Sequence, residues 1–126
     1  IPLIDIPALK LNNELNYKLK KWNHLNVRLA HEWVGKQNRY PNYNFETYIP
    51  TTGEYVEVDV STPPNAFQLI HLFGDITFLL NQKSTLNLMI GITNLFNTNY
   101  REYLNRLRYY ADDTGRNITI QIKFNY

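Results

Sequence analysis

The feature that most limits the possible folds of this chain is the strict alternation of apolar and polar residues in residues 117–126. Ile118, Ile120, Ile122, Phe124 and Tyr126 alternate with polar side chains throughout this segment. Successive side chains of a β-strand point to opposite faces of the sheet, so the segment predicts a strand with one apolar and one polar face. The folds that are possible for the whole chain depend on what contacts each of these two faces.

Earlier segments alternate in the same way, over residues 9–19, 25–33, 68–80 and 86–93. The connections between them are short, long, short and long, at residues 20–24, 35–64, 81–85 and 97–115. The chain is therefore predicted to be all-β, an antiparallel up-and-down sheet of about five strands with tight turns at one end and long loops at the other. A further short strand is expected at residues 55–60, within the first long loop. Strands of about 9–11 residues are long enough to cross a bilayer when tilted.

Alternation leaves two hypotheses open for the apolar face. In a soluble β-barrel or sandwich that serves as a binding module, this face is the core; in a membrane barrel, it faces lipid. Large aromatic residues near the strand ends favour lipid, because amphipathic rings prefer membrane interfaces. They are Tyr17, Trp22, Phe78, Phe124 and Tyr126 near the short turns, and Trp33 and Phe67 near the long loops. Lipid does not tolerate unpaired strand edges, so the membrane hypothesis makes the chain one arc of a larger barrel.

Composition narrows the function classes. The 126 residues suit a single domain, they include no cysteine, and the net charge of +2 is too small for a nucleic-acid binder. His24, His31 and His71 lack metal-ligand spacing, and no catalytic combination of side chains occurs. We therefore expect neither an enzyme nor a protein with a metal or cofactor, and we expect no nucleic-acid partner.

The long loops carry the candidate ligand contacts. Aromatic side chains on loops above a rigid scaffold commonly bind ligands, and the candidates here are Tyr40, Tyr43, Phe45, Tyr48 and Tyr55. The alternative is that these rings pack against other loop residues. Arg106 and Arg108, with Arg101, are candidates for an anionic ligand. Their alternative is ion pairing with Glu102, Asp112 or Asp113.

A series of short motifs from residue 94 onward resembles a known family. The motifs are Asn94-Leu95-Phe96-Asn97, Tyr100-Arg101-Glu102-Tyr103-Leu104, Arg108-Tyr109-Tyr110-Ala111-Asp112-Asp113 and Gly115-Arg116-Asn117, followed by an aromatic-ended strand. Together they resemble the C-terminal end of TonB-dependent outer-membrane receptors, most of all those of Bacteroidota. The segments at residues 36–41 and 61–64 are similar to the same group.

The resemblance implies a barrel of about 22 strands, plugged by an N-terminal domain, of which residues 1–126 are the last five strands. It places the chain in the bacterial outer membrane, with the long loops extracellular. Its implied partners are membrane lipid, the rest of the barrel and the plug, TonB through the N-terminal part, and the barrel-assembly machinery, for which Phe124 and Tyr126 form the C-terminal signal. The implied function is TonB-energised uptake of a scarce nutrient, most often a small molecule such as an iron–siderophore complex.

Overall fold

A computed structural model describes residues 6–22, 24–40, 44–58 and 62–126 of the chain. The described residues are all-β apart from one turn of 3₁₀ helix, η1. The strands are β1 (Lys10–Leu19), β2 (Leu25–Val34), β3 (Phe45–Ile49), β4 (Glu54–Val58), β5 (Phe67–Leu79), β6 (Thr85–Thr93) and β7 (Asn117–Asn125), and η1 spans Arg106–Tyr109. Over the described ranges, no helix has the length and apolar character needed to cross a membrane.

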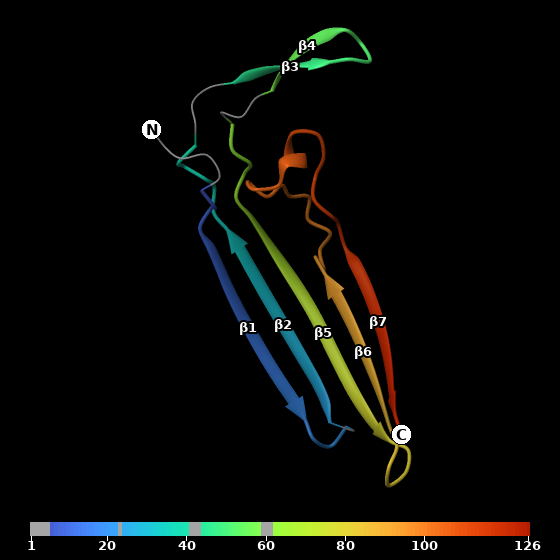
Figure 1. Cartoon of the computed structure of the whole chain (residues 1–126). Coiled ribbons are helices and arrows are strands. Elements are labelled where there is room, and N and C mark those ends of the chain that lie inside the picture. The colour runs from blue at the N-terminus through green and yellow to red at the C-terminus, as the bar shows by residue number, and fades with distance from the viewer. Residues whose placement is uncertain (1–5, 23, 41–43, 59–61) are drawn as a thin grey trace. The chain divides into compact units, whose positions relative to one another are not determined.

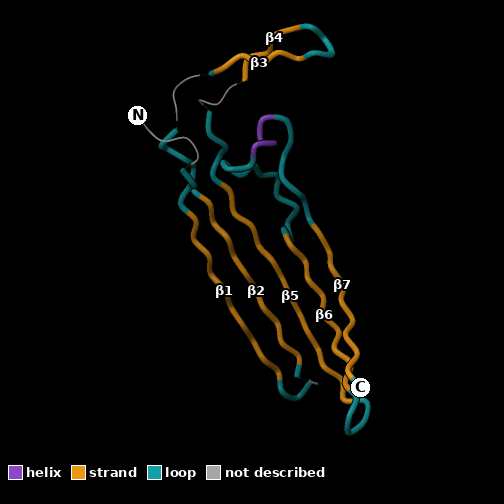
Figure 2. The backbone as a smooth tube through the Cα atoms, viewed as in Figure 1, coloured by secondary structure: helices purple, strands orange, loops and turns teal. Residues whose placement is uncertain are grey.

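The chain divides into two compact units. The loop unit comprises Ile1–Lys10, Val34–Phe67 and Asn99–Asp113, and the sheet unit comprises Leu11–Trp33, Gln68–Thr98 and Thr114–Tyr126. In the sheet unit, five strands lie in the order β1-β2-β5-β6-β7, and neighbouring strands run in opposite directions (Figures 1 and 2). The predicted antiparallel meander with alternating short and long connections is confirmed. It is an open sheet in which β1 and β7 are the edge strands.

The register of β5, β6 and β7 places the apolar residues of the three strands in common rows. One row contains Ile76, Leu88 and Ile122, and the next contains Phe78, Leu86 and Phe124. One intervening row, that of Thr77, Asn87 and Lys123, is polar on all three strands, and the other intervening rows combine polar residues with Phe73, Met89 or Leu79. The sequence prediction that these residues share faces is therefore confirmed residue by residue.

No protein layer covers the apolar face of β7 within the described part of the chain. The side chains of Ile118, Ile120, Ile122 and Phe124 are 61%, 64%, 68% and 53% exposed. Their row neighbours on β6 are half-buried or exposed, and Ile90 is 42% exposed. The side chains on this face are therefore buried only by their neighbours on the adjacent strands.

The opposite face is joined across the strands by polar contacts. Asn87 Nδ2 donates to Thr77 Oγ1 at 2.9 Å, and Asn26 Nδ2 donates to Asp75 Oδ1 at 3.1 Å. On the same face, the Arg28 guanidinium lies 4.3 Å from the centre of the Phe73 ring. This face is polar and internally hydrogen-bonded, so the sheet is amphipathic.

Three polar side chains on the apolar side of the pattern form a hydrogen-bonded row. His31 Nδ1 lies 3.3 Å from Asn13 Nδ2, and His31 Nε2 lies 3.2 Å from Gln68 Oε1. With a proton on Nε2, both ring nitrogens of His31 are satisfied, because Nδ1 accepts and Nε2 donates. The two residues that break the apolar pattern of β1 and β2 are therefore hydrogen-bonded to each other.

The first long loop contains a hairpin, of which the sequence predicted only one strand. The predicted strand at residues 55–60 corresponds to β4, whose pairing partner β3 is an addition; Asp59 and Val60 lie outside the described residues. The turn between β3 and β4 contains Gly53 at φ 70°, a conformation that glycine adopts without strain. Alternation over the five residues of β3 was too short to separate it from loop sequence.

Candidate functional site

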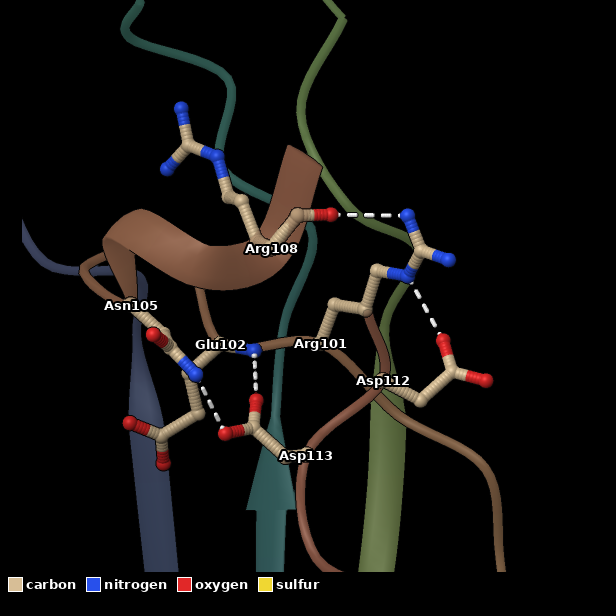
Figure 3. A network of polar contacts seen from close by, with 6 residues as sticks. All are labelled: Arg101, Glu102, Asn105, Arg108, Asp112 and Asp113. Carbon is tan, nitrogen blue, oxygen red and sulfur yellow. Dashed lines mark hydrogen bonds and ion pairs between the residues drawn. The ribbon is translucent and has the colours of Figure 1, made fainter. Parts of the chain in front are cut away.

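Asp113 organises the segment between residues 99 and 113. Its Oδ2 accepts a hydrogen bond from the backbone N–H of Glu102 at 2.8 Å, and its Oδ1 accepts one from Asn105 Nδ2 at 2.6 Å (Figure 3). Asn105 in turn caps η1, because its Oδ1 accepts from the backbone N–H of Leu107 at 3.0 Å. One carboxylate thus fixes both the start of the loop and the entry to its helical turn.

Arg101 is neutralised within the same segment. Its Nε donates to Asp112 Oδ1 at 2.6 Å, and its Nη1 donates to the carbonyl oxygen of Arg108 at 2.7 Å. For this arginine the structure favours the ion-pairing alternative. The guanidinium is then held by a carboxylate and a backbone carbonyl, so it carries little uncompensated charge.

Arg108 has a different environment. Its side chain is buried, with 8% of its surface exposed, and its guanidinium lies 4.1 Å from the Tyr103 ring centre and 4.6 Å from the Tyr109 ring centre. Its Nη2 donates to the Tyr109 hydroxyl at 2.6 Å, while Nε is buried without a hydrogen-bond partner. Figure 3 shows this guanidinium pointing away from the carboxylates of Asp112 and Asp113. Arg108 is therefore a buried cation whose described partners are aromatic rings and a hydroxyl, not an acid.

The aromatic residues predicted as ligand contacts in the first long loop lie in different environments. Tyr48 and Tyr55 lie directly opposite each other on β3 and β4, with ring centres 5.2 Å apart, as the packing alternative expected. Phe45 is exposed at the start of β3, and Tyr40 is half-buried outside the hairpin. Tyr43 lies outside the described residues.

An open depression of about 950 Å³ lies within the loop unit. Its lining comes from residues 47–50, 56–58, 62–67, 99–101, 108–110 and 112. Of the predicted ligand contacts, it brings together Tyr48, Arg101 and Arg108, while Arg106 is exposed elsewhere on η1. It adds Tyr100, Tyr109 and Tyr110, which belong to the motifs of the resemblance and were not predicted as ligand contacts.

The adjacency of Arg108 to Tyr109 and Tyr110 was the available sequence signal for those added tyrosines. Tyr100 is placed by a ring contact that no spacing predicts, since its ring centre lies 4.7 Å from that of Phe67. The site is therefore a tyrosine-rich cavity with one uncompensated arginine.

The first motif of the resemblance forms a turn in the sheet unit. Asn94 is 3% exposed at φ 51°, its Oδ1 accepts from the Thr98 N–H, and its own N–H donates to His71 Nδ1 at 3.0 Å. Leu95 continues from this turn by donating to the carbonyl of Ile70 at 2.7 Å. This half of the motif ends β6 and directs the chain away from the sheet.

The last motif is joined to the same turn. Asn97, at φ 54°, accepts a hydrogen bond on Oδ1 from the backbone N–H of Arg116 at 2.8 Å. A Cβ on Gly115 would lie 2.6 Å from that oxygen, so only glycine fits there without a shift. Asn97, Gly115 and Arg116 therefore fasten the start of β7 to the end of β6, whereas Phe96 is exposed.

No family model, no curated protein and no solved structure matches this chain. Within the described residues, no group of three or more histidine, cysteine, aspartate or glutamate side chains is arranged to hold a metal ion. Any functional assignment therefore rests on the geometry of the sheet and of the loop unit, and on the resemblance of the sequence motifs.

Proposed function

We propose that the chain is the C-terminal five-stranded arc of a TonB-dependent receptor barrel in the bacterial outer membrane. The receptor takes up a scarce nutrient, with an iron–siderophore complex as the first candidate. The observation that carries the proposal is the apolar face of the sheet, which is continuous across β5, β6 and β7 and uncovered along β7. Lipid is the environment in which such a face is stable without a protein layer.

The height of the apolar band supports this environment. The apolar face runs from Ile70 on β5 to Leu80, the residue directly after this strand. At a rise of about 3.4 Å per residue, ten steps span roughly 34 Å along the strand, and a tilt of about 40° reduces this to roughly 26 Å. The outward apolar band of outer-membrane barrels is about 25 Å tall.

The two ends of the band also fit a bilayer. At the end with the short turns, Tyr17 is 60% exposed and Trp22 is 67% exposed. At the other end, the row of Asn13, His31 and Gln68 puts neutral polar groups on the otherwise apolar face. Aromatic and neutral polar groups are both favoured where hydrocarbon gives way to headgroups.

The opposite face and the edges support a larger assembly. The hydrogen-bonded polar side chains of this opposite face suit the water-filled interior of a barrel. The free edge of β7 needs another strand, because an unpaired row of backbone groups in lipid costs several kcal/mol per group. In this proposal, the remaining strands of the barrel pair with β1 and β7.

Cysteine accessibility tests the proposal directly, because these 126 residues contain no cysteine. Thr52→Cys lies in the β3–β4 turn and Lys83→Cys in the short β5–β6 connection. In intact cells producing the cysteine-free full-length protein with one of these changes, a membrane-impermeant maleimide is expected to label the first cysteine. It labels the second only after the outer membrane is permeabilised.

The matched control is the cysteine-free parent, which is expected to remain unlabelled. Equal labelling of both cysteines in intact cells contradicts the proposed orientation. Recovery of the protein in the detergent-free soluble fraction contradicts the membrane location and favours the soluble binding module.

A further inference from the structure

We propose that the depression in the loop unit binds the carboxylate of an aromatic or apolar organic acid, and that Arg108 is the residue that holds it. The two arginines that line the depression differ in how their charges are compensated. Arg101 has its counter-ion in Asp112, at 2.6 Å. Arg108 has no acidic partner in the part of the chain that the structure describes, although its side chain is more than nine-tenths buried.

A buried donor on a charged group is costly when it lacks an acceptor. The unpartnered Nε of Arg108 is such a donor. A carboxylate that accepts from the guanidinium edge removes this cost and neutralises the charge.

The Arg108 guanidinium lies over the rings of Tyr103 and Tyr109, with its carbon 4.1 and 4.6 Å from the two ring centres, so the part of the group suited to an anion is the edge that carries the N–H groups. A planar carboxylate fits that edge through two parallel hydrogen bonds. The neighbouring cavity wall is rich in tyrosine, including Tyr100 and Tyr110, and this wall suits an aromatic or apolar body behind the acidic group.

The Tyr109 hydroxyl competes with a carboxylate for Arg108. It accepts from Nη2 at 2.6 Å, and Nη2 is one of the two nitrogens that a two-pronged acceptor on the Nε edge uses. The carboxylate therefore replaces this hydroxyl as it reaches Nε and Nη2, and the Tyr109 side chain moves aside. Removing the hydroxyl while keeping the ring is expected to strengthen binding, by about two- to tenfold for a hydrogen bond of about 0.5–1.5 kcal/mol.

The probes are benzoate and its neutral counterpart benzamide. Their binding to the full chain in detergent micelles is measured by ligand-observed NMR. Benzoate is expected to bind and benzamide not to bind. Arg108→Lys, which keeps the charge but loses the two-pronged edge, weakens benzoate at least about tenfold, the loss of roughly one charge-assisted hydrogen bond. Tyr109→Phe strengthens it, whereas Arg106→Gln, on the exposed side of the same turn, leaves it unchanged.

Several results overturn the inference. They are equal binding of benzamide, absence of benzoate binding at millimolar concentration, equal effects of Arg106→Gln and Arg108→Lys, or weaker binding by Tyr109→Phe. If Arg108→Lys does not fold, the comparison of the two probes and the gain in Tyr109→Phe still decide the matter. The inference stands on contacts inside the loop unit, so its failure leaves the membrane proposal untouched, and cysteine labelling tests that proposal separately.

Discussion

Replacing Ile120 by arginine tests what the apolar face of the sheet contacts. Ile120 lies in one of the middle rows of that face, directly opposite Ile90 on β6, and its side chain is 64% exposed. Its neighbour Gln121 points to the polar face and lies opposite Met89. The two residues are adjacent on β7 and both pair with β6, so they lie at nearly the same height along the strand. They differ mainly in the face of the sheet to which their side chains point.

The expected magnitudes separate three environments. In lipid, arginine near the middle of the band destabilises the folded barrel by about 2–4 kcal/mol, and Gln121→Arg stays within about 0.5 kcal/mol. In water, both substitutions stay within about 0.5 kcal/mol. Under a packed protein layer, arginine is again costly, but enlarging the side chain separates this case from lipid. Ile120→Trp costs about 1–3 kcal/mol in a packed core and little in a fluid bilayer.

The assay is denaturant unfolding of the full-length protein in lipid vesicles, with the folded fraction read from the mobility shift on unheated gels. The membrane proposal predicts a large loss for Ile120→Arg alone. A loss below about 0.5 kcal/mol for Ile120→Arg refutes the lipid assignment of this face, since that is the range of ordinary surface substitutions. A loss above about 1 kcal/mol for Ile120→Trp places a protein layer there instead.

Three further sets of substitutions test the local contacts, all measured by thermal unfolding and by hydrogen exchange of the affected segment. Asp113→Ala removes two hydrogen bonds to a half-buried carboxylate and is expected to destabilise its loop by about 2–4 kcal/mol, whereas Asp112→Ala, which breaks an exposed ion pair, costs at most about 1 kcal/mol. Gly91→Ala places a Cβ 3.0 Å from the Phe73 ring and costs about 1–3 kcal/mol, which Phe73→Leu in the same chain is expected to relieve in part. Gly53→Ala, at φ 70°, costs about 1–2 kcal/mol and loosens only the hairpin. Equal losses for the two aspartate variants, or a neutral Gly91→Ala, contradict these contacts.

The sheet could be predicted from the sequence because its determinants are local. Alternation over nine or more residues fixes which face each side chain takes, and the short turn at residues 80–84 fixes the register between β5 and β6. β3 escaped prediction because its five residues carry no more periodicity than a loop of the same composition. The row formed by Asn13, His31 and Gln68 escaped for another reason. The three residues lie on segments far apart in the sequence, and only pairing between strands brings them together.

The site was less predictable, because its properties depend on which groups meet and not on which groups are present. Arg101 and Arg108 are seven residues apart, and both precede Asp112 and Asp113 by a few residues. The sequence alone therefore does not show which arginine pairs with an aspartate. The fold separates them: η1 turns the Arg108 side chain toward Tyr103 and Tyr109, while the Arg108 carbonyl accepts from Arg101 and helps to hold that side chain against Asp112. The same helical turn thus neutralises one arginine and leaves the other buried without an acid. A loop whose role was only structural would gain most by pairing both, so the unpaired Arg108 is the residue at which a ligand most changes the free energy of the loop.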